Sequence, residues 1–136
     1  MNFHASFCDP FSLDIIDLGR IEKENILTTF SEIPWTNYLQ DMQGRPDDDI
    51  HYSPSLEIEN RDNQQSLSIS AVGEPSGFEF YIFYKRPKTV KTFLGLFERV
   101  ADDYVTDITG QTEQDALACL HALINHDFDY LEKKIP

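Results

Sequence analysis

The chain has 136 residues, of which 40% are hydrophobic, and this length and composition predict one globular domain spanning residues 1–136. Its 24 acidic and 11 basic residues give a net charge of −13, which repels phosphate backbones and anionic lipid and so disfavours nucleic acid and membrane surfaces as partners. The charge favours a basic protein partner or plain solubility, and the absence of a long apolar run or a basic, apolar leader predicts a cytoplasmic protein.

The N-terminal part of the chain shows helical spacing of its apolar residues. Two short helices are predicted, with Ser31 capping the second, Pro34 in its first turn and Gly44 ending it in the left-handed conformation. Before them, "DPFSLDIIDLG" is compatible with a helix starting after Asp9 or with an extended arm. The residues with helical spacing are Ile21, Ile26, Leu27 and Phe30, then Trp35, Tyr38, Leu39 and Met42.

The next segment, "QGRPDDDIHYSPS", contains glycine, prolines and an acidic run that break any regular pattern, so it is expected to be a loop. Its acidic run, Asp47, Asp48 and Asp49, lies close to His51 and offers ligands to a cation. The order of ligands in an EF-hand is absent, so the run is interpreted as a solvated acidic loop.

Beyond the loop the apolar period changes from helical to two, which is typical of strands. Three strands are predicted over "LEIEN" (56–60), "SLSISAV" (66–72) and "FEFYIFYK" (78–85). The segments "RDNQQ" and "GEPSG" between them have the composition of turns, so the three strands are expected to form an antiparallel meander.

The segment "KTVKTFLGLFERVADD" (88–103) is less regular. Val90, Phe93, Leu94 and Phe97 have helical spacing, but Gly95 interrupts it, so a short helix or an irregular crossover is expected.

The C-terminal part predicts a strand followed by a helix. "DYVTDIT" alternates with period two and is expected to be a fourth strand that ends at Gly110. Thr112 and Asp115 resemble a capping arrangement for the helix "EQDALACLHALIN". The predicted fold class is therefore α+β: an antiparallel sheet of about four strands, a three-strand meander plus one, with N-terminal helices and a C-terminal helix packed on one face.

The strand at 78–85 raises a question, because both of its faces carry large side chains. The face expected beneath the helices holds Leu56, Ile58, Leu67, Ile69, Phe80, Ile82 and Tyr84. The other face holds Tyr81 and Phe83 beside serines, glutamates and Lys85. Three covers are open: the "DPFSLDII" arm or the crossover around Phe93, a partner protein, or a second copy of the chain.

Candidate chemistry is sparse. His121 is two residues from Cys119 and five from His126, so neither pair converges on one side of a helix. Cys119 falls on an apolar helix face and Cys8 in the N-terminal segment, and two separate thiols are expected in a reducing compartment. We expect no catalysis, metal or cofactor. The basic cluster "KRPKTVK" is expected to solvate a strand end or to pair with nearby acids.

With the aromatic strand ending in "FYKRPK", the strand "YVTDITG" and the closing helix ending in "HDFDYLEKKI", the outline resembles small bacterial immunity proteins of polymorphic-toxin and contact-dependent inhibition systems. Those families are compact, often acidic α+β domains without catalytic residues. The resemblance implies a non-catalytic protein, monomeric or homodimeric, that neutralises a toxin by occluding its basic active site.

On this reading the outer sheet face binds the partner, with carboxylates setting rate and register and aromatic side chains as anchors. Two alternatives remain: a homodimeric adaptor or structural module, and a small-molecule site between helix and sheet lined by Trp35, Tyr38, Tyr84 and Phe97. The expected partner-binding residues are Glu57, Glu59, Glu79, Tyr81 and Phe83, with Asp47, Asp48 and Asp49 as a secondary acidic contact.

Overall fold

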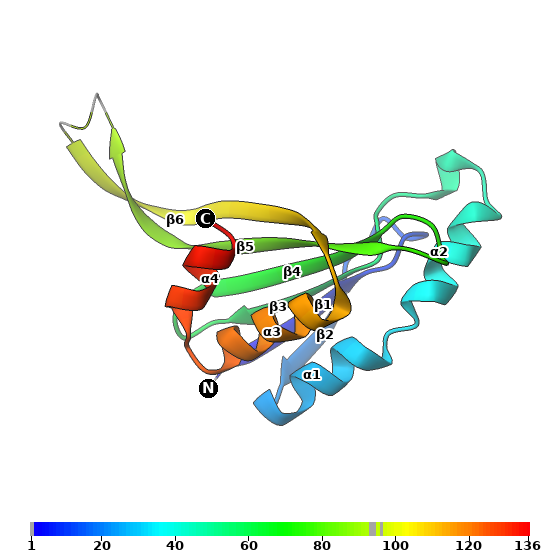
Figure 1. Cartoon of the computed structure of the whole chain (residues 1–136), viewed down its shortest axis with the longest axis horizontal. Coiled ribbons are helices and arrows are strands. Elements are labelled where there is room, and N and C mark those ends of the chain that lie inside the picture. Colours follow the sequence, from blue (N-terminus) through cyan, green and yellow to red (C-terminus); the bar gives the residue numbers. More distant parts are fainter. Residues whose placement is uncertain (1, 93–94, 96) are drawn as a thin grey trace.

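The computed structural model describes residues 2–92, 95 and 97–136 as one antiparallel sheet with helices against one of its faces (Figure 1). This confirms the predicted α+β class. The described strands are β1 (Phe3–Cys8), β2 (Ile16–Ile21), β3 (Ser55–Asn60), β4 (Gln65–Val72), β5 (Glu79–Thr92) and β6 (Phe97–Gln111). The described helices are α1 (Lys23–Glu32), α2 (Trp35–Gln43), α3 (Glu113–Ile124) and α4 (Phe128–Lys134), with a 3-10 turn η1 (Asp47–Asp49).

Within the described residues the sheet has six strands in the order β2-β1-β3-β4-β5-β6, so the predicted number of about four was too low. The predicted meander is β3, β4 and the first part of β5, and the predicted fourth strand is the second part of β6. The two strands not predicted are β1 and β2, which pair with each other and extend the sheet beyond β3. The ambiguous "DPFSLDIIDLG" segment therefore contains a strand instead of a helix.

The predicted helix or crossover at 88–103 is wrong for the part of this segment that the structure describes. β5 continues to Thr92 and β6 starts at Phe97, and Thr89 pairs with Val100 in a two-stranded ribbon that projects beyond the helices (Figure 1). β-branched side chains on both strands favour the extended conformation over a helix. Phe93 and Leu94 lie outside the described residues.

The two predicted N-terminal helices are confirmed, except that Ile21 lies in β2, but their predicted caps are not. Ser31 lies inside α1, and Pro34 is the N-cap of α2, where its ring separates the two helices. Gly44 ends α2 with φ −85°, so it does not adopt the left-handed conformation. At α3 the predicted capping box is confirmed: the Thr112 hydroxyl accepts from the Asp115 N–H, and the Asp115 carboxylate accepts from the Thr112 N–H.

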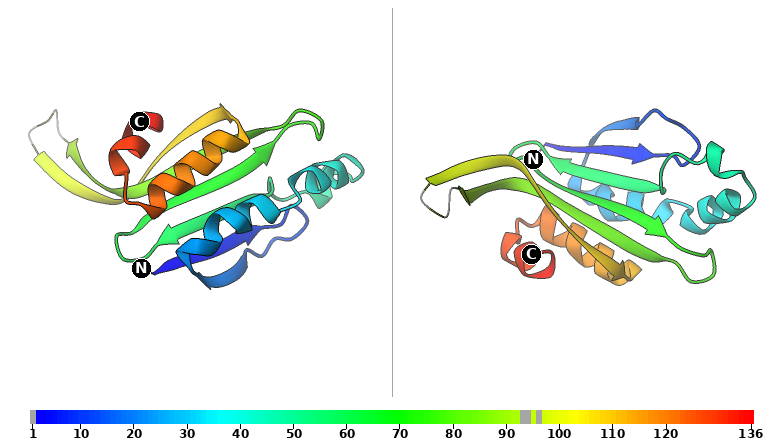
Figure 2. Two further views of the ribbon diagram at one scale, coloured as in Figure 1. Left: turned by 60° about the horizontal axis from the view of Figure 1, so that its bottom comes forward. Right: turned by 90° about the horizontal axis from the view of Figure 1, so that it is seen from above.

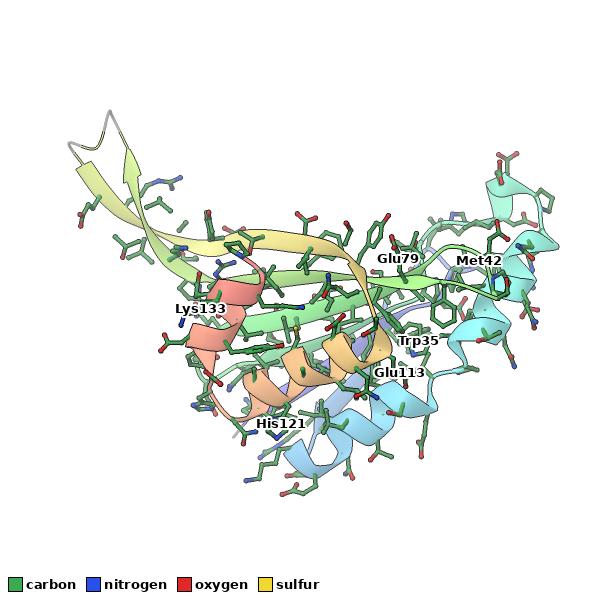
Figure 3. All side chains as sticks on the ribbon, viewed as in Figure 1. Trp35, Met42, Glu79, Glu113, His121 and Lys133 are labelled. Carbon is green, nitrogen blue, oxygen red and sulfur yellow. The ribbon has the colours of Figure 1, made fainter. Side chains whose placement is uncertain are left out.

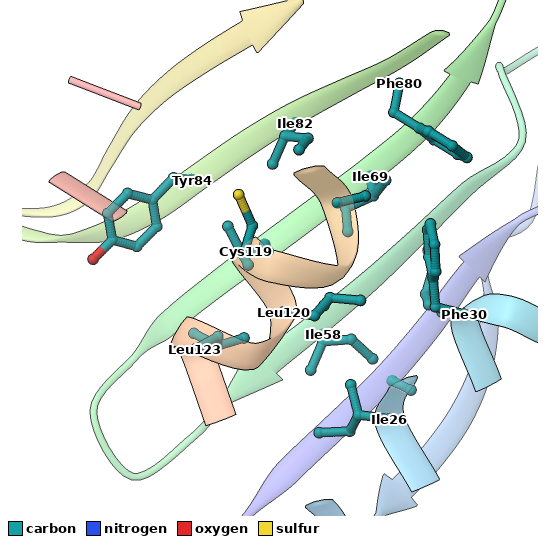
Figure 4. Close-up of a cluster of buried hydrophobic side chains, with 14 of the residues drawn as sticks. Ile26, Phe30, Ile58, Ile69, Phe80, Ile82, Tyr84, Cys119, Leu120 and Leu123 are labelled. Carbon is teal, nitrogen blue, oxygen red and sulfur yellow. The ribbon is translucent and has the colours of Figure 1, made fainter. Parts of the chain in front are cut away.

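The core lies between the sheet and the helices, which all lie on the same side of it (Figure 2). Ile26 and Phe30 of α1 and Leu120 of α3 are fully buried against the sheet (Figure 4). Each such side chain contributes about 1.5 to 3 kcal/mol by leaving water. The seven side chains predicted to face the helices are each no more than 3% exposed, which confirms the predicted inner face: Leu56, Ile58, Leu67, Ile69, Phe80, Ile82 and Tyr84.

A buried arginine of β5 forms hydrogen bonds that hold α4 against the sheet. The Arg86 guanidinium donates through Nε and Nη2 to the two Glu132 carboxylate oxygens, each at 2.9 Å, and through Nη1 to Thr106 Oγ1 at 2.6 Å. The guanidinium also lies over the Tyr84 and Tyr104 rings. Lys88 adds a second cation to Glu132, so this part of the "KRPKTVK" cluster pairs with a nearby acid, one of the two predicted roles.

Candidate protein-binding face

The face of the sheet opposite the helices, called the open face below, displays the predicted outer side chains in register. Ser6 of β1 lies opposite Glu57 of β3, Glu57 opposite Ser68 of β4, and Ser68 opposite Phe83 of β5. Asp107 of β6 follows Phe83 in the same row. With about 4.8 Å between strands, Glu57 and Asp107 lie on either side of the Phe83 strand within roughly 15 Å of each other.

Serines make a low strip beside the aromatic side chains. Ser55 and Ser70 share a hydrogen bond with 2.6 Å between their hydroxyl oxygens. Ser66 and Ser70 are buried although they face outward, because the longer Lys85 and Tyr81 stand beside them on β5. Phe83 therefore projects above its neighbour Ser68 and is 37% exposed.

The "DPFSLDII" arm, one of the three expected covers, does not lie on the open face. The His51 N–H donates to the Pro10 carbonyl and the Tyr52 hydroxyl donates to the Leu13 carbonyl, so this arm follows the loop before β3. The arm leads into β2, which three strands separate from β5. The other expected cover was the crossover around Phe93: its described residues belong to the ribbon of β5 and β6, and Phe93 itself lies outside the described residues. The helices of the described part of the chain lie on the other side of the sheet (Figure 2).

Carboxylates surround the aromatic side chains on the open face. Glu57 is half-buried, while Glu59 lies 2.8 Å from the Arg61 Nε in a partly exposed ion pair. Glu79 is exposed at the start of β5, at the end of the sheet nearest α2 (Figure 3). A single ion pair between exposed side chains contributes little free energy. The combined field of these carboxylates nevertheless attracts a basic surface.

Two polar residues of β1 and β2 complete this face and were not predicted. His4 Nε2 lies 2.6 Å from Asp17 Oδ1 across the two strands. The pKa of Asp17 is lowered, mainly because the Gly19 N–H donates to its carboxylate and also because His4 does. The period-two alternation of "FHASFC", with Phe3, Ala5 and Phe7 buried, was the signal that identifies β1.

The acidic run predicted to make a secondary contact lies at the end of the sheet that carries Glu79. Asp47, Asp48 and Asp49 form η1 and are all exposed, as expected for a solvated loop. Gln43, just before this loop, donates to Glu74 in the turn that precedes β5. The acidic run is therefore not part of the strands that form the open face.

Two of the four residues expected to line an alternative small-molecule site lie in the core. Trp35 packs edge-on against Phe80 in the core and is 6% exposed, and Tyr84 is fully buried beside Arg86. Phe97 is paired with Thr92 in the projecting ribbon, away from both. Trp35 and Tyr84 are therefore core residues.

The thiols are poor nucleophiles. Burial raises the pKa of Cys119 to about 11, and it is a core residue as predicted. Burial and the neighbouring Glu57 carboxylate raise the pKa of Cys8. Neither cysteine is in a disulfide. Among residues 2–92, 95 and 97–136, no group of three or more His, Cys, Asp or Glu side chains is placed to hold a metal ion.

A scan against protein-family models, a search of curated proteins and a search of solved structures each found no match. In the described part of the chain, no helix has the length and apolarity needed to cross a membrane.

Proposed function

We propose that this chain is a non-catalytic binding protein of the immunity type, which neutralises a toxin by covering its basic active site with the open face. One observation carries the proposal: Phe83 is 37% exposed on a sheet face that no described helix covers, in a row that also holds Glu57 and Asp107. An apolar anchor between carboxylates is the arrangement expected for binding a basic protein surface.

The anchor has a modest energetic value, which the charge complements. Phe83 has roughly 55 to 95 Å² still exposed, and covering it contributes about 1.4 to 2.4 kcal/mol. Tyr81 adds a smaller increment because it is already half-buried. The net charge of −13 steers a basic partner toward the protein and raises the association rate toward roughly 10⁸ M⁻¹s⁻¹ at low salt.

The proposed mechanism is occlusion. Glu57, Glu59 and Glu79 occupy cationic subsites that a toxin acting on nucleic acid uses for phosphate groups, and the serine strip lets the two surfaces approach closely. Asp47, Asp48 and Asp49 extend the acidic contact at one end. No bond is made or broken in this mechanism.

The test is growth of a bacterial host that expresses the product of the gene next to this one, with and without this protein supplied in trans. Rescue from toxicity by the wild type, and loss of rescue in the double variant Tyr81→Ala with Glu79→Ala, is the expected result. Val100→Ser, which changes a 59% exposed side chain of the ribbon, is the matched control and is expected to rescue. A toxic neighbour that kills equally with and without this protein contradicts the immunity role for that pair.

A further inference from the structure

A second apolar surface lies on the helix side of the sheet, at the edge formed by β2. Phe7, Ile16, Leu18, Thr29, Ile33, Pro34 and Tyr38 line a groove of about 260 Å³, called the β2 groove below. Phe7 and Ile16 are paired across β1 and β2, and Phe7 is buried on the helix side, so the groove lies between the edge strand and the junction of α1 and α2. It does not share residues with the proposed binding face.

Two residues that line the groove, Ile16 and Leu18, belong to a run of exposed aliphatic side chains. Leu13 is 69% exposed, Ile15 61%, Ile16 42% and Leu18 48%, all within one short segment of the chain. Scattered apolar residues are normal on a surface, but a contiguous run beside an apolar hollow is typical of an interaction site.

The edge strand β2 is better suited to contact a partner's side chain than to pair with a partner's strand. The pairing of β1 with β2 shifts register between Ala5 and Ser6, and Gly19 at this bulge has φ 80°. A bulge in an edge strand interrupts the row of backbone groups that an added strand needs. The hollow beside Leu18 is therefore the part of this edge that suits a partner.

The charges around the β2 groove decide between occupants. The lining residues are uncharged, but Asp14 and Glu32 are exposed and lie within two residues of the lining residues Ile16 and Ile33 in the chain. Asp9 also lies close enough to Tyr38 to add to the effect of burial in raising the pKa of that hydroxyl. A fatty-acid carboxylate or a second copy of this acidic chain would bring like charge to this rim.

We propose that the β2 groove is a second docking site, which takes an apolar side chain from a protein segment whose flanking residues are lysine or arginine. The aliphatic side chain fills the hollow beside Leu18, and the flanking cations lie near Asp9, Asp14 and Glu32. This site is independent of the open face, because a different set of residues forms it.

The probe is a short synthetic peptide with one central leucine between lysines, titrated into ¹⁵N-labelled protein. Shift changes are expected at Ile16, Leu18, Ile33 and Tyr38. A peptide with alanine in place of leucine is expected to bind about tenfold more weakly, because the anchor is lost at constant charge. A peptide with glutamates in place of lysines is expected not to bind.

Two variants distinguish binding in the β2 groove from nonspecific electrostatic attraction of the basic peptide to an acidic protein. Leu18→Ser is expected to remove the preference for leucine over alanine, while Val105→Ser, at the other edge of the sheet, is expected to keep it. Equal binding of the leucine and alanine peptides overturns the proposal, as do shift changes centred on Phe83. It is also overturned if light scattering shows a dimer that Leu18→Ser dissociates, because a second copy then occupies the groove.

Discussion

Arg86 carries a positive charge, yet its side chain is almost completely buried. Its side chain is 2% exposed, whereas that of its partner Glu132 is 37% exposed. The fork of two parallel hydrogen bonds, the Thr106 hydroxyl and the Tyr84 ring together satisfy the guanidinium away from water. An arginine in the core therefore stabilises the position of α4 only while Glu132 is in place.

Glu132→Gln is expected to lower the free energy of unfolding by about 2 kcal/mol, because it leaves the buried guanidinium without its counter-charge. The figure is below that for a fully buried pair because water reaches Glu132. Chemical denaturation followed by circular dichroism measures the change. Glu32→Gln, at an exposed position of α1, is the matched control and is expected to change stability by less than about 0.5 kcal/mol.

The same pair gives the protein a pH dependence with a definite sign. Hydrogen bonds from Arg86 lower the pKa of Glu132 below its usual value of 4.5 in the folded state. Its contribution to stability is therefore complete above about pH 4.5 and is lost as the pH falls through the lowered pKa. Denaturation at a series of acidic pH values is expected to show a smaller loss for Glu132→Gln than for the wild type, and an equal loss would exclude this carboxylate as a cause.

The two thiols are expected to differ in reactivity. At pH 8 an alkylating reagent should label the half-buried Cys8 slowly and leave Cys119 unlabelled until the protein unfolds, because burial raises both pKa values and encloses Cys119. Mass spectrometry of labelled peptides distinguishes the sites. Rapid labelling of both in native protein would show that α3 does not seal the core.

At the level of single elements, the start of α3 depends on its capping box. Thr112→Ala is expected to cost about 1 kcal/mol, since the hydroxyl accepts from the Asp115 N–H at 3.1 Å. Thr28→Ala, an exposed position inside α1, removes the same group without a cap and is expected to be neutral or slightly stabilising. Thermal unfolding of both variants makes the comparison, and equal loss in both would mean that the cap contributes nothing.

The elements that could be predicted are those whose pattern is set locally. β3, β4 and the first part of β5 alternate regularly and end at turn residues, and Thr112 with Asp115 marks a helix start. β2 could not be identified in this way, because a bulge at Gly19 interrupts its alternation and its register is set by pairing with β1. Local spacing also favoured a helix for 88–103, where pairing between β5 and β6 determines the structure instead.

The candidate site was predictable in part for the same reason. Period two placed Glu57, Tyr81 and Phe83 on one face, and strand pairing brings them together there. His4 and Asp17 join that face only through the order of strands, which no local pattern contains. The burial of Arg86 depends on α4 folding back over β5 after His126, which has φ 57° and divides the predicted closing helix into α3 and α4.

At the level of the whole molecule, the two faces of the sheet differ in whether helices cover them, and the chain carries a large negative charge. The helices occupy one face of the sheet, and the other presents carboxylates around Phe83. If this face binds a basic toxin, the association rate constant should fall at least tenfold between low and physiological salt while the dissociation rate changes little. Stopped-flow mixing at several salt concentrations measures both rates, and a salt-independent association rate would exclude electrostatic steering.

The most direct test of the central claim is the dissociation constant for the toxin domain that the wild type neutralises, measured with Phe83→Ser and with Val100→Ser. We predict that Phe83→Ser weakens binding by about tenfold or more while its thermal unfolding stays close to that of the wild type, and that Val100→Ser leaves binding unchanged. Unchanged affinity of a folded Phe83→Ser protein would contradict the assignment of the open face as the binding surface.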